Sequence, residues 1–198
     1  MSAIRLVLFD LDGVVRHFDP ENVATIEREH GLDVGAIEAR AFAPSHLELV
    51  TTGAISRAEW IHRVGEELGN PVAAEAWGSQ PFEADEEVLE LADELRARGI
   101  RTAILTNGTD TIPEEVKSLG LDSHFDAVFN SAEIGWMKPD ERAFRHVIEA
   151  MGVEPTEVFF TDDSAAKLVG ADALGIAVHH FVGVEELREA LAMAGVWG

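Results

Sequence analysis

The sequence has 198 residues, of which 46% are hydrophobic, so it can form a packed globular core. Its 37 acidic residues against 15 basic ones give a formal net charge of -22, which would repel nucleic acid and anionic membranes, and neither is expected as a partner. The absence of cysteine excludes disulfides and thiolate metal sites. No secretory signal pattern and no apolar run of about 18 residues is found, so a cytoplasmic protein is expected.

The first predicted element is a short strand over residues 4–10. Its apolar side chains follow one another without alternation, so both faces of this strand are predicted to be buried. Residues 16–80 are helical in pattern and contain no convincing strand. The clearest helix follows Ser56, which is predicted to form a capping box with Glu59, and it ends at Gly69.

After residue 80, predicted helices and strands alternate along the chain. The strands are expected at 100–107, 125–131, 157–163 and 176–181, and the helices at 85–99, 111–119, 138–152, 164–175 and 184–194. Repeated strand–helix units are typical of right-handed crossovers and of a mostly parallel sheet with helices on both faces. The fold class is therefore α/β, a Rossmann-like doubly wound parallel sheet. Residues 1–15 and 81–198 are predicted to form this core domain, and residues 16–80 a small all-helical cap inserted after the first strand.

Polar residues collect at the carboxyl ends of the predicted strands, which is where open α/β sheets bind ligands. They are Asp10 and Asp12, then Thr106 and Asn107 followed by Gly108, then Lys138 at the start of a helix, and finally Asp162 and Asp163. Carboxylates so close together repel one another and lose hydration, so they need a compensating group. With oxygen ligands alone, a hard cation such as Mg2+ is favoured.

These side chains together fit phosphoryl transfer. A carboxylate can act as a nucleophile once a cation is bound. Lys138 and Thr106 could hold an anionic substrate and neutralise charge in the transition state. The expected cofactor is Mg2+, and the expected partner is a small phosphorylated molecule. The metal and Lys138 also explain how so acidic a chain would accept a phosphate, since distant charges are screened beyond about 8 Å at physiological salt.

Four segments resemble the haloacid dehalogenase-like hydrolase superfamily, and specifically its capped, phosphatase-like subfamily I. They are DLDGV at 10–14, LTNG at 105–108, GWMKPDERAF at 135–144 and FFTDDS at 159–164, in the order and spacing of the family. The resemblance implies that Asp10 is the nucleophile and forms an aspartyl-phosphate, and that Asp12 is the general acid and base. It also implies that Thr106 and the backbone N–H of Asn107 bind the phosphoryl group, and that Lys138 pairs with Asp10 and the phosphoryl oxygens.

The resemblance also implies a metal site and a substrate site. Mg2+ would be held by Asp10, the backbone carbonyl of Asp12, Asp163 and, directly or through water, Asp162. Substrate contacts are predicted for Asn107 and Gly108. Trp136 is also predicted as a substrate contact, from its position beside Lys138 and not from the resemblance, with a packing role as the alternative. Trp60 and Trp77 in the cap are interpreted as core residues, with a place in the substrate pocket as the alternative.

One position departs from the family pattern. Relatives with paired aspartates often carry Asn or Asp four residues after the second one, where this sequence has Lys167. A lysine there could pair with Asp162 and leave catalysis intact, or it could weaken the metal site.

The favoured function is a Mg2+-dependent phosphatase, and four alternatives stay open. A haloacid dehalogenase uses the same nucleophile but usually has a bulky aromatic residue in place of Asp12, whereas a phosphomutase keeps both aspartates. A phospho-accepting domain of the response-regulator type has its acids in a different order. A catalytically weakened relative that only binds a ligand is supported by Lys167 alone.

Overall fold

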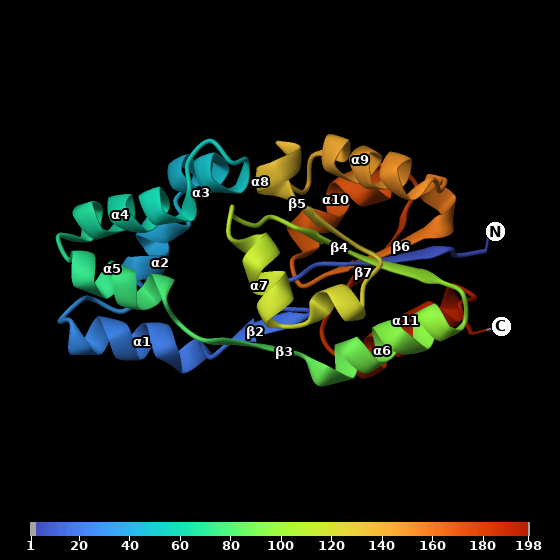
Figure 1. Ribbon diagram of the computed structural model, residues 1–198, viewed down its shortest axis with the longest axis horizontal. Helices are drawn as coiled ribbons and strands as arrows, with labels where there is room; N and C mark the ends of the chain where they lie inside the picture. The colour runs from blue at the N-terminus through green and yellow to red at the C-terminus, as the bar shows by residue number, and fades with distance from the viewer. Residues whose placement is uncertain (1–2, 198) are drawn as a thin grey trace.

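The computed structural model describes residues 3–197 and contains a five-stranded parallel sheet between layers of helices (Figure 1). The strand order is β5–β4–β1–β6–β7, which places the first strand of the chain at the centre. The strands are β1 (Leu6–Phe9), β4 (Arg101–Thr106), β5 (Ala127–Asn130), β6 (Val158–Asp162) and β7 (Ala177–His180). The predicted α/β fold with a parallel sheet is confirmed.

Helices cover both faces of this sheet. They are α6 (Glu86–Ala97), α7 (Ile112–Ser118), α8 (Ser131–Ile134), α9 (Glu141–Met151), α10 (Ala165–Ala173) and α11 (Val184–Met193), with short 3-10 turns η1 (Leu121–Ser123) and η2 (Pro155–Glu157). Within residues 3–197, no helix has the length and apolar character that crossing a bilayer requires.

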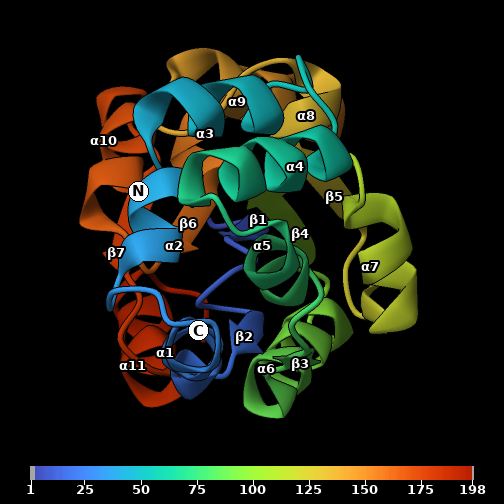
Figure 2. The same cartoon turned by 90° about the vertical axis from the view of Figure 1, so that its left-hand side faces the viewer.

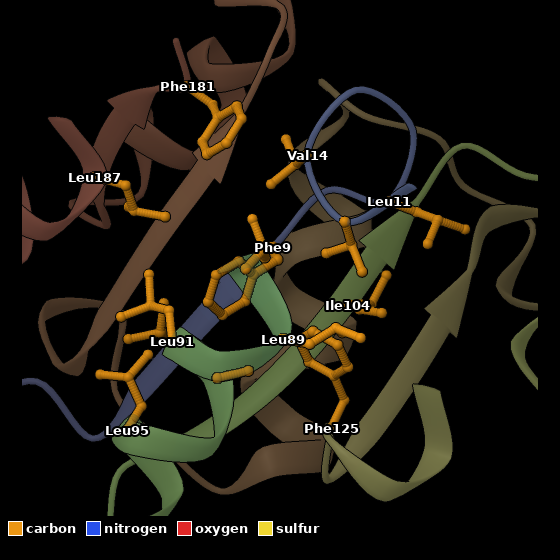
Figure 3. Close-up of a cluster of buried hydrophobic side chains, with 14 of the residues drawn as sticks. Phe9, Leu11, Val14, Leu89, Leu91, Leu95, Ile104, Phe125, Phe181 and Leu187 are labelled. Carbon is orange, nitrogen blue, oxygen red and sulfur yellow. The ribbon is translucent and has the colours of Figure 1, made fainter. Parts of the chain in front are cut away.

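The central strand is buried on both faces because its side chains alternate between two hydrophobic clusters. Val7 and Phe9 lie in a cluster with side chains of α6 and α11, and Figure 3 shows Phe9 among those helices. Leu6 and Leu8 lie in a second cluster with side chains of α9 and α10. This two-sided burial fixes β1 in the middle of the molecule, so the residue that follows Phe9 is held at a defined place on the carboxyl edge of the sheet.

Five further helices lie beyond the carboxyl ends of the sheet strands (Figures 1 and 2). They are α1 (Pro20–Glu29), α2 (Ala36–Ala41), α3 (Pro44–Thr51), α4 (Arg57–Leu68) and α5 (Pro71–Gly78). Buried side chains of these helices, including Ile37, Val50, Trp60, Val64 and Trp77, form a hydrophobic cluster separate from the two that flank the sheet. We propose that these helices are the predicted cap.

The helix predicted after Ser56 is α4, and its ends are set as the sequence indicates. The Ser56 side chain accepts a hydrogen bond from the backbone N–H of Glu59 at 3.1 Å, and Gly69 ends the helix with φ of 64°. The capping box is only half formed, because the Glu59 carboxylate accepts from Arg63 at 2.8 Å.

Two short strands, absent from the sequence prediction, join the helices to the sheet. β2 (Arg16–Phe18) and β3 (Phe82–Ala84) pair antiparallel, so the expectation that residues 16–80 contain no strand is wrong. Three residues are too few to show strand periodicity. Side chains stabilise the ribbon: Phe18 and Phe82 pack edge to face with ring centroids 5.7 Å apart, and the Arg16 guanidinium lies over both rings.

Gly170 of α10 provides a test of how tightly this fold holds the loop after residue 137. A Cβ atom at Gly170 would lie 1.8 Å from the backbone oxygen of Pro139, a distance that requires backbone movement. We expect Gly170→Ala to lower the free energy of unfolding, measured by urea denaturation, by at least about 1 kcal/mol. Val169→Ala, an exposed neighbour on the same helix, is the control and should change stability by less than about 0.5 kcal/mol. Equal stability of the two variants would contradict this packing.

Candidate active site

The carboxyl ends of three adjacent strands bring the predicted polar residues together. Asp10 follows β1, Thr106 ends β4 and Asp162 ends β6, and all three side chains are buried. The backbone N–H of Asp10 donates to the carbonyl of Thr161 at 2.9 Å, which continues the β1–β6 pairing. The sheet order therefore places residues from distant parts of the chain on a single edge, as the sequence predicted.

A buried ammonium group connects the two innermost carboxylates. Lys138 Nζ lies 2.7 Å from Asp10 Oδ1 and 2.7 Å from Asp162 Oδ2, and none of the three side chains is more than 2% exposed. Backbone N–H groups also bind the acids: Leu11 donates to Asp10 Oδ1 at 2.7 Å and Ser164 to Asp162 Oδ1 at 2.9 Å. Buried charges are tolerated when they are paired and hydrogen-bonded in this way.

The two carboxyl groups differ in how readily they ionise. Burial alone would raise the pKa of Asp10, but Lys138 and Lys167 outweigh it and hold this pKa below its ordinary value. Burial, with the adjacent Asp10 charge, raises the pKa of Asp162 to about 6 against the opposing effect of Lys138. Asp10 therefore stays ionised to a lower pH than Asp162, and the ionised carboxylate is the form that a nucleophile requires.

Asp163 completes a group of three carboxylates that could hold a metal ion. Asp10, Asp162 and Asp163 each offer an oxygen, and these oxygens lie within 4.8 Å of one another. The donor set consists of oxygen atoms, which fits Mg2+. Gly13 permits the approach of Asp163: its φ is 86°, and a Cβ there would lie 2.3 Å from Asp163 Oδ2.

Lys167 reaches the same three carboxylates from the first turns of α10. Its Nζ is 3.1 Å from Asp10 Oδ2, 3.7 Å from Asp162 Oδ1 and 3.8 Å from Asp163 Oδ1. The expected pairing with Asp162 is present, but the nearer partner is Asp10.

Asn107 holds the backbone that carries Lys138. Its side-chain Nδ2 donates to the Lys138 carbonyl at 2.9 Å, and its Oδ1 accepts from the Lys138 N–H at 2.7 Å. At Gly108, a Cβ atom would lie 2.4 Å from the Ile112 side chain and 2.9 Å from the Asn130 side chain, so the position has no room for a larger residue. The Asn107 side chain therefore has a positioning role, which the sequence prediction of a backbone contact to phosphate did not include.

The Asp12 side chain is not one of the three carboxylates that could hold a metal, and it pairs with Arg16 at the cavity. Its Oδ1 accepts from Arg16 Nε at 2.6 Å, and its side chain is 43% exposed. Arg16 is itself buried and also donates to Glu115 of α7. Arg16 and Glu115 were not predicted as site residues.

A cavity of about 520 Å3 lies between the helices and the sheet edge. Asp12, Asn107 and Gly108 line it from the sheet side. Five aromatic side chains from the helices and the ribbon also line it, namely Phe18, Phe42, Trp60, Trp77 and Phe82. The lining includes charged side chains as well, among them Arg16, Glu38, Arg57 and Glu115. Trp60 and Trp77 thus serve both the hydrophobic cluster and the cavity wall.

Trp136 lies elsewhere. It is absent from the residues that line this cavity, its side chain is 37% exposed, and the Arg142 guanidinium lies 5.4 Å from its ring centroid. The structure therefore does not bring Trp136 together with the other predicted substrate contacts.

Comparison with known proteins agrees with the geometry. The family model described as haloacid dehalogenase-like hydrolase matches residues 4–175. The chain belongs to the haloacid dehalogenase-like hydrolases.

Individual relatives of this hydrolase include phosphatases. It is 42% identical over 85 residues to the phosphoserine phosphatase of Thermus thermophilus, a match that spans 42% of this chain and only 34% of the relative. It is 29% identical to human haloacid dehalogenase-like hydrolase domain-containing protein 3, over 93% of this chain and 84% of the relative. A HAD family enzyme from Bacteroides thetaiotaomicron, crystallised with magnesium and inorganic phosphate, superposes with a TM-score of 0.74 at 26% identity, covering 89% of this chain and 93% of that one.

The Arg16–Glu115 pair in this hydrolase gives a prediction about pH. Burial would raise the pKa of Glu115, but hydrogen bonds from Thr111 and Arg16 hold it below the ordinary value of 4.5. A lowered folded-state pKa stabilises the fold above pH 4.5, and that stability is lost as the pH falls through the folded-state value. We expect Glu115→Gln to lower the free energy of unfolding by about 1–3 kcal/mol at pH 7.

The difference between Glu115→Gln and the wild type should shrink as the pH falls below 4.5, measured by urea denaturation across a pH series. Glu114→Gln removes an exposed acid of the same helix turn and should behave like the wild type. Parallel pH curves for Glu115→Gln and the wild type would contradict the prediction.

Proposed function

We propose that this hydrolase is a Mg2+-dependent phosphatase that hydrolyses a small phosphorylated metabolite through an aspartyl-phosphate on Asp10. The observation that carries the proposal is the buried Asp10 carboxylate between two ammonium groups, two residues before a second carboxyl, Asp12, that lines the cavity. Phosphatase relatives and a magnesium- and phosphate-bound structural neighbour support it.

The first half of the proposed reaction transfers the phosphoryl group to Asp10. Both Asp10 oxygens have ammonium partners, Oδ1 with Lys138 and Oδ2 with Lys167, and one of them would attack phosphorus while the other faces the metal. As the new bond from Asp10 to phosphorus forms, the bond from phosphorus to the ester oxygen breaks, and Asp12 gives that oxygen its proton so that the alcohol leaves neutral. Lys138 and the Thr106 hydroxyl would stabilise the charge on the phosphoryl oxygens.

The second half returns the enzyme to its starting state. Asp12, now a carboxylate, takes a proton from a water molecule whose oxygen attacks phosphorus. The bond between Asp10 and phosphorus breaks, inorganic phosphate leaves, and Asp10 is again an ionised carboxylate. Arg16 keeps Asp12 directed into the cavity during both halves.

The proposed metal ligands are the side chains of Asp10, Asp163 and Asp162, together with the backbone carbonyl of Asp12. A bound Mg2+ supplies positive charge that neutralises these carboxylates and the incoming phosphate. The protein's own side chains would bind and orient the phosphoryl group, and Asp12 would transfer the protons.

Replacement of the nucleophile tests the proposal. We expect wild-type protein to hydrolyse p-nitrophenyl phosphate only when Mg2+ is present, and EDTA to abolish the activity. Asp10→Asn should lower kcat by at least about 1,000-fold because the amide cannot form the phosphorylated intermediate. The matched control is Asp172→Asn, which alters an exposed residue of α10 and should keep wild-type kcat. Metal-dependent turnover by Asp10→Asn would refute the nucleophile assignment.

The cavity supports a substrate whose alcohol portion has an apolar or aromatic surface. Five aromatic side chains line it, and a volume of about 520 Å3 is within the usual range for a small-molecule site. Phe42 contributes to this wall while remaining 50% exposed. Its ring centroid lies 6.3 Å from that of Trp60 and 6.3 Å from that of Trp77. Its truncation should therefore affect the wall more than the fold.

We expect Phe42→Ala to lower kcat/KM for 1-naphthyl phosphate roughly tenfold, through loss of apolar contact. For glycerol phosphate, which lacks an aromatic group, the change should be less than about twofold. Val72→Ala removes an exposed apolar side chain outside the cavity and should leave both values unchanged. An equal loss for both substrates would contradict an aromatic contact at Phe42.

A further inference from the structure

The Lys167 ammonium group lies against the carboxylates that are the proposed ligands of the metal. Lys167 lies four residues after Asp163, so it faces the carboxylates from the first turns of α10. Its Nζ is within 4.0 Å of an oxygen of each acid in the metal-binding group, and nearest to Asp10 at 3.1 Å. Lys138 and Lys167, two of the three lysines in the sequence, are thus concentrated on the same acids.

The oxygen atoms left for a metal are those that face Lys167. Asp10 Oδ1 already accepts from Lys138 and from the Leu11 N–H, which leaves Oδ2, and Oδ2 is the atom that contacts Lys167. Asp162 Oδ2 is likewise committed to Lys138, and its Oδ1, which accepts from the Ser164 N–H at 2.9 Å, is the atom on the Lys167 side. A metal on these oxygens would therefore lie next to the ammonium group.

The charges at the site oppose that arrangement. Three carboxylates face two ammonium groups, which leaves a single negative charge when Lys167 is present and two when it is absent. A divalent cation is attracted more strongly by the second arrangement, and two positive charges a few ångströms apart repel by several kcal/mol at a partly buried site.

The Lys167 ammonium group can also move away from the carboxylates into solvent. The Lys167 side chain is 31% exposed, whereas Lys138 is fully buried. A lysine stem is flexible, and its ammonium is well hydrated, so this group can move into water at small cost.

We propose that Lys167 is an internal competitor for the metal: its ammonium neutralises the acidic group in the metal-free protein and is displaced when Mg2+ binds. The inference rests on the proposed function only for the location of the metal. It predicts that Lys167 weakens Mg2+ binding and stabilises the metal-free fold.

The decisive variant is Lys167→Met, which removes the charge without adding an oxygen ligand. When this variant is titrated in its metal-free form with MgCl2 by isothermal calorimetry, its Kd for Mg2+ should be lower than that of the wild type by roughly tenfold or more. Lys167→Asn, a second neutral substitution, should also bind more tightly. Lys117→Met, at an exposed lysine of α7, is the matched control and should bind Mg2+ as the wild type does.

Thermal unfolding gives an independent measurement. In EDTA, Lys167→Met should have a lower Tm than the wild type, because three carboxylates lose one of their two cations. Saturating Mg2+ should then raise the Tm of Lys167→Met more than that of the wild type.

Equal or weaker Mg2+ binding by both neutral variants would overturn the inference, and so would the absence of Mg2+ binding in variants and wild type alike. These measurements contain no substrate, so they are separable from the test of the phosphatase. Tighter binding by Lys167→Met in a protein that hydrolyses no phosphate ester would support the competitor and refute the proposed function.

Discussion

The structure around the site depends on the ammonium group that Lys138 shares between Asp10 and Asp162. Two carboxylates at the ends of adjacent buried strands could not both be ionised there without a cation, because burial and mutual repulsion favour the protonated form. The sheet order makes this contact possible, since β1 and β6 are neighbours. Asn107, from the end of β4, then holds the Lys138 backbone through two hydrogen bonds. The ends of three strands are thus joined through one residue, Lys138: its ammonium group contacts the acids after β1 and in β6, and its backbone is held by the Asn107 side chain after β4.

Much of this arrangement could be predicted from the sequence, because the relevant patterns are local. A continuous apolar run predicted that β1 is buried on both faces, and Ser56 with Gly69 predicted the ends of α4. The position of acids at or directly after the ends of predicted parallel strands was enough to predict that Asp10, Asp162 and Asp163 lie close together.

The rest could not be predicted, because it depends on side-chain direction or on contacts between distant segments. Arg16 and Glu115 are 99 residues apart, and Lys167 and Asp10 are 157 residues apart, so no periodicity connects them. Trp136 is close to Lys138 in sequence, yet its ring packs against Arg142, because proximity along the chain does not determine where a side chain points. The ribbon strands are too short to show a pattern of their own.

The ribbon of β2 and β3 also gives Arg16 two duties at once. It is the cation that packs on Phe18 and Phe82 at the junction of helices and sheet, and it is the partner of Asp12. The packing at this junction and the direction of the Asp12 carboxylate therefore depend on the same guanidinium group. Any change in how the ribbon holds Arg16 would also change the surroundings of the Asp12 carboxylate in the cavity wall.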